Sequence, residues 1–235
     1  MTFGSTFGRV LSPTFQPKSQ AAAGGWWDLN GTITSCIAAY QPKGAASYAA
    51  SKVNLANAGT YDAVNGSAYP TWEAETGWSF VAANSQYLTT GIVPSNTNTA
   101  NSAIVRFTNG GAVNYSFLFG ARFTGGGYKT GISPLDSYNR VAYFNCHYSG
   151  AGKTPQLTGG VLAFSGASAY RNGVDESITI PTGYTNNGYG YFIGSLNKNG
   201  TPVQFTTAKI QAIAFYNTAI SAAQVAALTT AMAAL

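Results

Sequence analysis

The stretch Ser168-Ala-Tyr-Arg-Asn-Gly-Val-Asp-Glu-Ser-Ile-Thr-Ile180 is the clearest local determinant of the fold. Asn172-Gly173 in its middle can supply the two positive-φ residues of a type I′ turn. Residues 168–171 and 174–180 on either side alternate apolar and polar side chains, as half-buried strands do. The stretch therefore predicts a tight antiparallel hairpin.

The same alternation recurs from residue 102 onward. Segments that carry Gly, Asn and Pro, which suit turns, separate one stretch from the next. Besides the hairpin, the expected strands are residues 102–108, 116–123, 140–148, 160–165, 188–194 and 209–216. In residues 116–123, one side is expected to carry Phe117, Phe119, Ala121 and Phe123. So many strands require two stacked sheets, and the sequence predicts an all-β, two-sheet antiparallel sandwich.

Residues 221–235 change character. Ser221 followed by Gln224 is a capping-box pattern. Apolar residues then recur at spacings of three and four, namely Val225, Leu228, Met232 and Leu235. We expect a short C-terminal helix whose apolar side packs on the sandwich or on a neighbouring subunit, and loss of Leu228 should loosen it. Residues 47–57, in the less regular part of the chain before residue 94, could be helix or loop.

The composition indicates a β-rich protein with a weakly charged surface. Hydrophobic residues make up 45% of the 235 residues, but charged residues only 8%, against about 25% in ordinary globular proteins. Abundant Gly, Ser, Thr and Asn suit tight turns and a surface solvated by hydroxyls and amides. We expect one sandwich domain over residues 26–235, preceded by an extended arm, residues 1–25. The arm is either a floppy tag or a segment that orders against a neighbouring subunit.

Charge and hydropathy limit the partners. The net charge of +5 arises from scattered Lys and Arg without a basic run, so no nucleic-acid partner is expected. No apolar stretch approaches the ~18–20 residues that cross a bilayer, so no membrane insertion is expected. Nothing resembles a secretory signal, and classical export is not the expected route if the protein works outside a cell.

The titratable residues predict no catalytic site. Sandwich-fold glycosidases place two carboxylates across the scissile bond, but Glu73 and Glu75 have no third acid nearby and are expected to be surface acids. The sole histidine, His147, is expected to be a packed or surface strand residue, and no Gly-x-Ser-x-Gly elbow is present. We therefore expect a non-enzymatic protein with no cofactor.

Metal and phosphate sites are not expected. Residues 150–154, Gly-Ala-Gly-Lys-Thr, lack the glycine–lysine spacing of a phosphate-binding loop. This segment and residues 125–129 are expected to be ordinary loops. Cys36 and Cys146 lack metal-site spacing and are either buried thiols or one disulfide. Four aspartates are isolated in the sequence, Asp28, Asp62, Asp136 and Asp175. A calcium ion held by one of them plus backbone carbonyls stays possible.

Exposed aromatic rings beside amide and hydroxyl groups would suit sugar binding. The chain is rich in both, although burial in the core or in a subunit contact is the favoured interpretation for each single aromatic residue. The candidates are Trp72, Trp78, Tyr128, Tyr138, Tyr184 and Tyr189. The sequence does not choose a glycan-binding set among them.

Several motifs, in their order along the chain, resemble the laminin-G-like branch of the concanavalin A-like superfamily. They are Trp78-Ser-Phe80, Gln86-Tyr-Leu88 with Gly91-Ile92, Ala169-Tyr-Arg-Asn-Gly-Val174, Phe192-Ile-Gly194, and Lys209 to Thr218 leading into Ile220-Ser-Ala-Ala-Gln-Val225. Ile220 and Gln224 replace the leucine and glutamate usual in that family. The resemblance implies that the two-sheet antiparallel sandwich has the jelly-roll topology.

A second resemblance concerns Ala38-Ala-Tyr-Gln-Pro-Lys-Gly-Ala-Ala-Ser47, Asn54-Leu-Ala-Asn57 and Gly59-Thr-Tyr-Asp62, which are similar to the lead-in of such domains in tailed-bacteriophage proteins. It implies a structural protein on the virion surface, assembled in the host cytoplasm: a head decoration, a head fibre or a tail-fibre domain. The implied partners are other virion proteins or copies of the chain itself, in a homo-oligomer, reached through the arm. The alternative is a lectin-like module that binds a cell-surface glycan.

Overall fold

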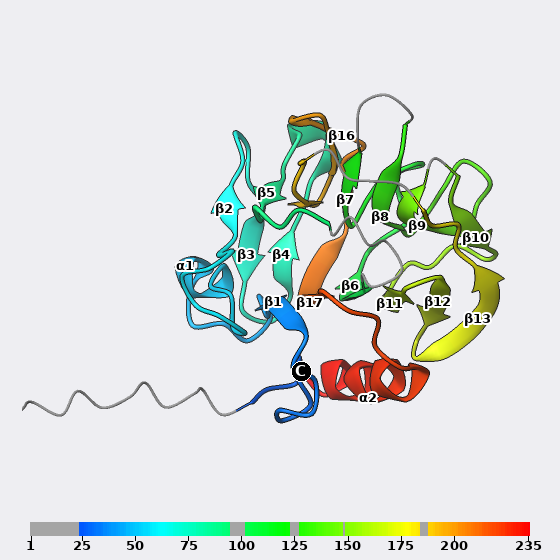
Figure 1. The fold of residues 1–235 in the computed structure, drawn as a ribbon. Coiled ribbons are helices and arrows are strands. Elements are labelled where there is room, and N and C mark those ends of the chain that lie inside the picture. Colours follow the sequence, from blue (N-terminus) through cyan, green and yellow to red (C-terminus); the bar gives the residue numbers. More distant parts are fainter. Residues whose placement is uncertain (1–23, 95–101, 123–126, 148, 184–187) are drawn as a thin grey trace, which may run out of the picture.

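The computed structural model describes residues 24–94, 102–122, 127–147, 149–183 and 188–235. Two β-sheets lie face to face, with one long helix against the outside of the first (Figure 1). The chain therefore forms the all-β, two-sheet antiparallel sandwich that the strand pattern predicts. The arm predicted at residues 1–25 falls almost entirely outside the described residues.

The first sheet has eight strands. In spatial order they are β13 (Val174–Thr179), β12 (Ser168–Arg171), β11 (Gly160–Ser165), β6 (Ser102–Thr108), β17 (Lys209–Tyr216), β4 (Gly77–Ser79) and β3 (Thr71–Glu73), with β1 (Cys36–Tyr40) pairing the other end of β17. Arg171 and Val174 face each other across the predicted hairpin turn. Asn172 and Gly173 have φ values of 50° and 80°, which confirms the type I′ turn.

The second sheet has nine strands. In spatial order they are β10 (Ala151–Lys153), β9 (Val141–His147), β8 (Lys129–Ser133), β7 (Phe119–Arg122), β14 (Phe192–Ile193), β5 (Leu88–Thr89) and β2 (Val64–Asn65), with β15 (Leu196–Lys198) beside β7 and β16 (Thr201–Val203) beside β15. All these pairs are antiparallel except β15 with β7, which is parallel. The remaining elements are α1 (Tyr48–Ser51), the 3-10 turn η1 (Ala82–Asn84) and α2 (Ala222–Ala233).

The main core fills the space between the sheets. Val105 and Phe107 of β6 point into it, whereas Ile104 points to the outside, because successive strand residues alternate faces. Phe119 of β7 meets Phe215 of β17 edge to face, with ring centroids 5.2 Å apart. Aromatic pairs of this kind hold the two sheets at a fixed separation.

Helix α2 covers the outer face of the first sheet, where it contacts β6, β11 and β13. Ser221 and Gln224 form the predicted capping box, with bonds of 3.2 and 2.8 Å. Val225, Leu228 and Met232 are fully buried against the sheet. Arg106 of β6 donates hydrogen bonds to the carbonyls of Met232 and Leu235, at the end where the helix dipole favours a cation.

Three of the local expectations need correction. Phe117 does not share the inner face with Phe119, because it precedes β7 and its amide bonds to Gln204 instead of a ladder partner; it packs with Phe144 outside the second sheet. Residues 188–194 form a strand only at β14. Residues 150–154, expected to be a loop, contain the short strand β10, because they pair with β9 at the edge of the second sheet. The alternative left open at residues 47–57 is decided as the single helical turn α1 followed by loop. Phe123 lies outside the described residues.

The lead-in segment, residues 38–62, is part of the packed sandwich. The amide side chain of the buried Asn54 accepts from Ala39 N at 2.9 Å and donates to the carbonyls of Ile37 and Thr60 at 2.9 and 2.8 Å. Trp78 of β4 donates its indole N–H to Ser51 Oγ at 2.8 Å. These bonds connect the segment to strands β1 and β4 of the first sheet and to the core.

Candidate functional site

A depression on the outer face of the second sheet combines an exposed aromatic ring with fixed polar groups; we call it the Tyr138 pocket. Its volume is about 230 Å³, below the ~300–1,000 Å³ typical of enclosed ligand pockets, so it is a shallow surface site. The lining residues are Tyr115, Asp136, Ser137, Tyr138, Arg140, Ala142, Phe144 and Gly150. They come from β9, from the segments before and after it in the chain, and, for Tyr115, from the segment between β6 and β7.

The loop between β8 and β9 builds the pocket around Asp136, which is 4% exposed. One carboxylate oxygen accepts from the amides of Tyr138 and Arg140 at 2.8 and 3.0 Å. The other accepts from Nε and Nη2 of Arg140 at 3.0 and 2.7 Å. All the acceptor positions of Asp136 are thus used to hold the loop and the guanidinium.

The two outward groups of the loop are the Arg140 guanidinium and the Tyr138 ring. The guanidinium carbon lies 4.8 Å from the ring centroid, a cation–π contact that orients the ring. Tyr138 is 71% exposed, and the Arg140 side chain is 34% exposed. One ring face and the Nη1 donors of Arg140 therefore remain available to a ligand.

Phe144 of β9 and the glycines of the neighbouring segment shape the floor of the pocket. A Cβ at Gly150 would lie 2.4 Å from the Phe144 ring, and a Cβ at Gly152 would lie 2.8 Å from Arg140 Nε. Both glycines are needed for this close approach. A larger side chain at either position would push into the site.

The other aromatic candidates are less accessible. Trp78 is fully buried, so it is a core residue and not a sugar-stacking one. Trp72 is half buried, with its indole N–H bonded to the carbonyl of Pro42 at 2.8 Å. Tyr128 and Tyr189 are also half buried, and Tyr184 lies outside the described residues. Tyr138 is the candidate that combines exposure with convergent polar groups.

The candidate catalytic residues are dispersed. Glu73 and Glu75 are exposed at the β3–β4 turn, as expected, and Glu73 accepts from the Thr76 hydroxyl at 3.2 Å. His147 ends β9 and its Nδ1 accepts from Ser149 N at 3.1 Å. Neither place combines acid and base around a pocket.

A second depression, of about 300 Å³, lies beside β13 and includes Asp175 and Glu176. Both carboxylates have structural roles. Glu176 pairs with Arg171 at 2.7 Å, and Asp175 accepts from Ser177 N at 2.8 Å. Burial and the neighbouring Glu176 raise the pKa of Tyr143 well above its ordinary value. These contacts hold the edge of the first sheet at β13 against β9 of the second. Asp175 and Glu176 are therefore not arranged as the two carboxyl groups of a glycosidase, which face each other across the scissile bond.

The two cysteines are separate free thiols. Burial raises the pKa of Cys36 to about 12 and that of Cys146 to about 11, so both are protonated at neutral pH. A protonated thiol is a poor nucleophile, and of the two only Cys146 is fully buried. The alternative of one disulfide is excluded.

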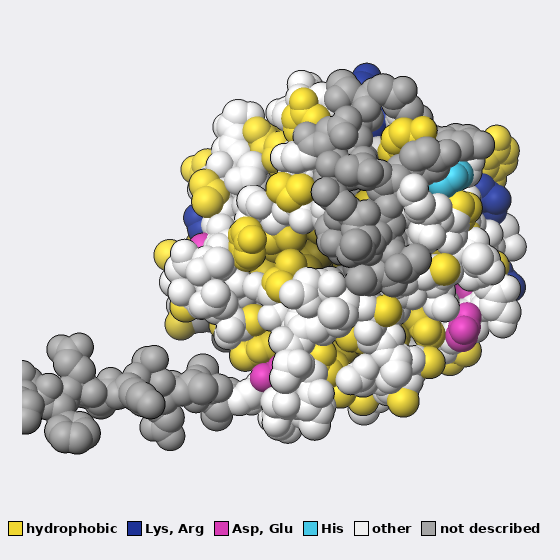
Figure 2. Space-filling model, viewed as in Figure 1, with side chains coloured by type: hydrophobic (Ala, Val, Ile, Leu, Met, Phe, Trp, Pro, Cys, Tyr) yellow, Lys and Arg dark blue, Asp and Glu magenta, His cyan; other side chains and the backbone are white. Residues whose placement is uncertain are grey.

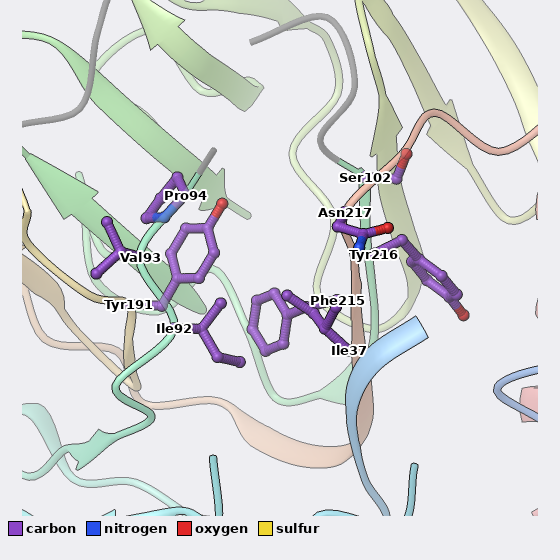
Figure 3. A pocket seen from close by; sticks show the side chains of 9 residues that line it. All are labelled: Ile37, Ile92, Val93, Pro94, Ser102, Tyr191, Phe215, Tyr216 and Asn217. Carbon is purple, nitrogen blue, oxygen red and sulfur yellow. The ribbon is translucent and has the colours of Figure 1, made fainter. Parts of the chain in front are cut away.

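A cavity between the sheets is lined mainly by apolar groups (Figure 3). The Tyr191 ring stacks on Phe215 with centroids 4.9 Å apart, and Ile92 lies beside them. Its volume of about 50 Å³ has room for a few waters and not for a sugar ring. We regard it as a packing gap.

Within the residues described, no group of three or more His, Cys, Asp or Glu side chains could hold a metal ion. Over the same residues, no helix has the length and apolarity to span a bilayer.

On the face shown in Figure 2, charged side chains are few and scattered among uncharged ones, as the composition predicts.

The sequence reasoning missed the partnership of Asp136 with Arg140. It treated Asp136 as an isolated acid and Arg140 only as the start of a strand. The signal available was the Asp-x-x-x-Arg spacing around Tyr138-Asn139, where Asn139 has a φ of 58°. An Asx-type turn there brings the carboxylate and guanidinium together.

By its fold and its candidate site, the protein is an antiparallel β-sandwich with an exposed aromatic ring in a surface depression. No protein-family model matches the sequence, and no curated protein matches it either. Among solved structures, the fold is similar to domain 4 of AbnA, a GH43 extracellular arabinanase from Geobacillus stearothermophilus, in complex with arabinotriose. The TM-score is 0.56 at 16% identity, over 83% of this chain and 98% of that domain.

The fold is also similar to part of Trypanosoma rangeli sialidase. With the inhibitor DANA bound, that structure matches at a TM-score of 0.56 and 15% identity, over 82% of this chain and 32% of the sialidase chain. The complex with 2,3-difluorosialic acid matches at a TM-score of 0.58 and 12% identity, over 85% and 33%. This chain thus spans about a third of the sialidase. At these identities the likeness establishes the sandwich fold.

Proposed function

We propose that this chain is a non-catalytic carbohydrate-binding module and that the Tyr138 pocket is its sugar site. The observation that carries the proposal is the Tyr138 ring, held beside Arg140 by the fully bonded Asp136. A sugar presents an apolar ring face and a rim of hydroxyls. An exposed aromatic ring matches the first, and fixed donors match the second.

Two further points support this function. The similar arabinanase domain was solved with arabinotriose, and this chain aligns with 98% of it. The Asp136 oxygens are already saturated by four hydrogen bonds, so this carboxylate is placed to orient and not to transfer a proton.

The test is binding of the purified chain to a glycan array, followed by calorimetry on the sugars that bind. Tyr138→Ala should weaken binding by about 5- to 160-fold, since a stacked aromatic ring contributes about 1–3 kcal/mol in comparable stacking sites. Tyr69→Ala is a matched control, because Tyr69 is 53% exposed and lies outside this pocket. Equal losses in both variants, or loss only with Tyr69→Ala, would place the site elsewhere.

The same sugars test the absence of catalysis. Prolonged incubation should release no new reducing ends. Release that is abolished by replacing one of the chain's acids would contradict the non-enzymatic proposal.

We propose, as a second point, that the module is carried on the surface of a tailed-phage particle. The support is the resemblance of residues 38–62 to the lead-in of such domains in tailed-bacteriophage proteins. On such a particle, many weakly binding copies would act together through avidity. Mass spectrometry and antibody labelling of purified particles should find the chain on the outside of intact virions, and its absence from them would refute this location.

A further inference from the structure

Three basic residues lie in one row across the second sheet, although they are far apart in the sequence. Lys198 of β15 is opposite Arg122 of β7, and Arg122 is opposite Lys129 of β8. Residues directly opposite each other in a sheet share a face. We call these three residues the basic row.

The basic row is on the same face as the Tyr138 pocket. Arg122 follows Gly120 by two residues, and Lys129 precedes Gly131 by two; Phe117 packs over both glycines outside the sheet. Lys129 Nζ lies 4.6 Å from the centroid of Phe144, which lines the pocket. It also donates to the Tyr115 hydroxyl at 2.9 Å.

None of the three cations has a carboxylate partner. All seven acids of the chain lie in its described part, where the two ion pairs are Arg140–Asp136 and Arg171–Glu176. Lys129 is nevertheless only 7% exposed. Like charges directly opposite in a sheet repel, and burial of an ammonium without a negatively charged partner is unfavourable. An anionic ligand would offset both effects.

Tyr115 connects the row to the pocket. A lysine ammonium can only donate hydrogen bonds, so the Tyr115 oxygen accepts from Lys129 and its own proton is available to an acceptor on a ligand. Along β9, the pocket residue Ala142 is five residues from His147, the residue opposite Lys129, or about 17 Å. The row and the pocket therefore lie on the same outer face of the second sheet, joined by the Lys129–Tyr115 bond.

We infer that the glycan bound by this face is acidic, with carboxylate or sulfate groups on the basic row and a sugar ring on Tyr138. This inference rests on the proposed function and adds the charge class of the sugar. The Arg140–Asp136 pair is neutral as a unit, so the row supplies the net positive charge.

The test is calorimetric titration of the full chain with polygalacturonate, a sulfated dextran, unmodified dextran, a neutral arabinan and a single-stranded oligothymidylate. The double variant Arg122→Gln/Lys198→Gln removes two charges from the row. Lys153→Gln/Lys209→Gln is the matched control, because it removes two charges from positions outside the row. The buried Lys129 is left intact so that folding is not disturbed.

We expect the row variant to bind the acidic polymer about tenfold more weakly and the control variant within about twofold of the parent, as for loss of two exposed ion pairs. Raising salt from about 0.1 to about 1 M should weaken binding, since the screening length falls from about 10 to about 3 Å. Preference for polygalacturonate or for sulfated dextran then identifies the anionic group.

Three results would overturn the inference. If a neutral polymer binds through Tyr138 and the row variant has no effect, the carbohydrate function stands and the acidic class is wrong. If no sugar polymer binds, both fail. If the oligothymidylate binds more tightly than every sugar polymer and binding depends on the row, the ligand of this face is a nucleic acid.

Discussion

Replacing Leu228 tests whether α2 is an integral part of the sandwich. Leu228 is fully buried, in the cluster that includes Ile104, Ala163 and Ala214 of the first sheet. Leu→Ala removes three carbons, each contributing about 0.8 kcal/mol of transfer free energy, or about 2.4 kcal/mol. A cavity contribution increases this, so the expected loss in the free energy of unfolding is about 3 kcal/mol.

The assay is urea and thermal denaturation followed by circular dichroism. For a chain of this size, about 3 kcal/mol corresponds to a fall in Tm of about 6–12 °C. The matched control is Leu235→Ala, the same substitution in the same segment at a half-buried position; it should cost less than about 1 kcal/mol. Equal effects of the two substitutions, or no effect of the first, would refute the packing of α2 on the sheet.

Three further predictions concern the turn, the lead-in and the thiols. Gly173→Ala should lower the free energy of unfolding by about 1–2 kcal/mol, because its φ is +80° and the added Cβ would lie 3.3 Å from Ala226 Cα; an unchanged urea midpoint would contradict this. Asn54→Ala should cost about 3 kcal/mol, because it leaves several buried backbone groups unpaired, and a loss below 1 kcal/mol in urea denaturation would show that the lead-in packs loosely. Cys36 and Cys146, with pKa values raised to about 12 and 11, should react with a thiol reagent only after unfolding. Since the unfolded thiols ionise near 9.0 and the native ones do not, stability should fall as pH rises above about 9, and denaturation at pH 7 and 10 would show it.

The placement of Phe117 shows where sequence periodicity loses its power. It matches the alternation of Phe119 and Ala121, yet it lies on the opposite side of the sheet. The pattern records which residues are apolar, but where the ladder begins depends on the partner strands. The backbone N–H of Phe117 bonds to Gln204, a residue distant in sequence, so Phe117 lies outside the strand β7 that begins at Phe119.

The sequence by itself determined the features that depend on neighbouring residues. The Asn172-Gly173 turn, the strand alternation and the capping box of α2 each follow from the steric and hydrogen-bonding preferences of a few consecutive residues.

Only the tertiary structure decided what lies on the outer face of the second sheet. Trp78 and Tyr138 are both aromatic residues in the sequence, but one fills the core and the other is exposed beside Arg140. Arg122, Lys129 and Lys198 form a row because strand register places them opposite one another. Strand register and side-chain burial are set by contacts between segments far apart in the sequence, so neighbouring residues alone do not reveal them.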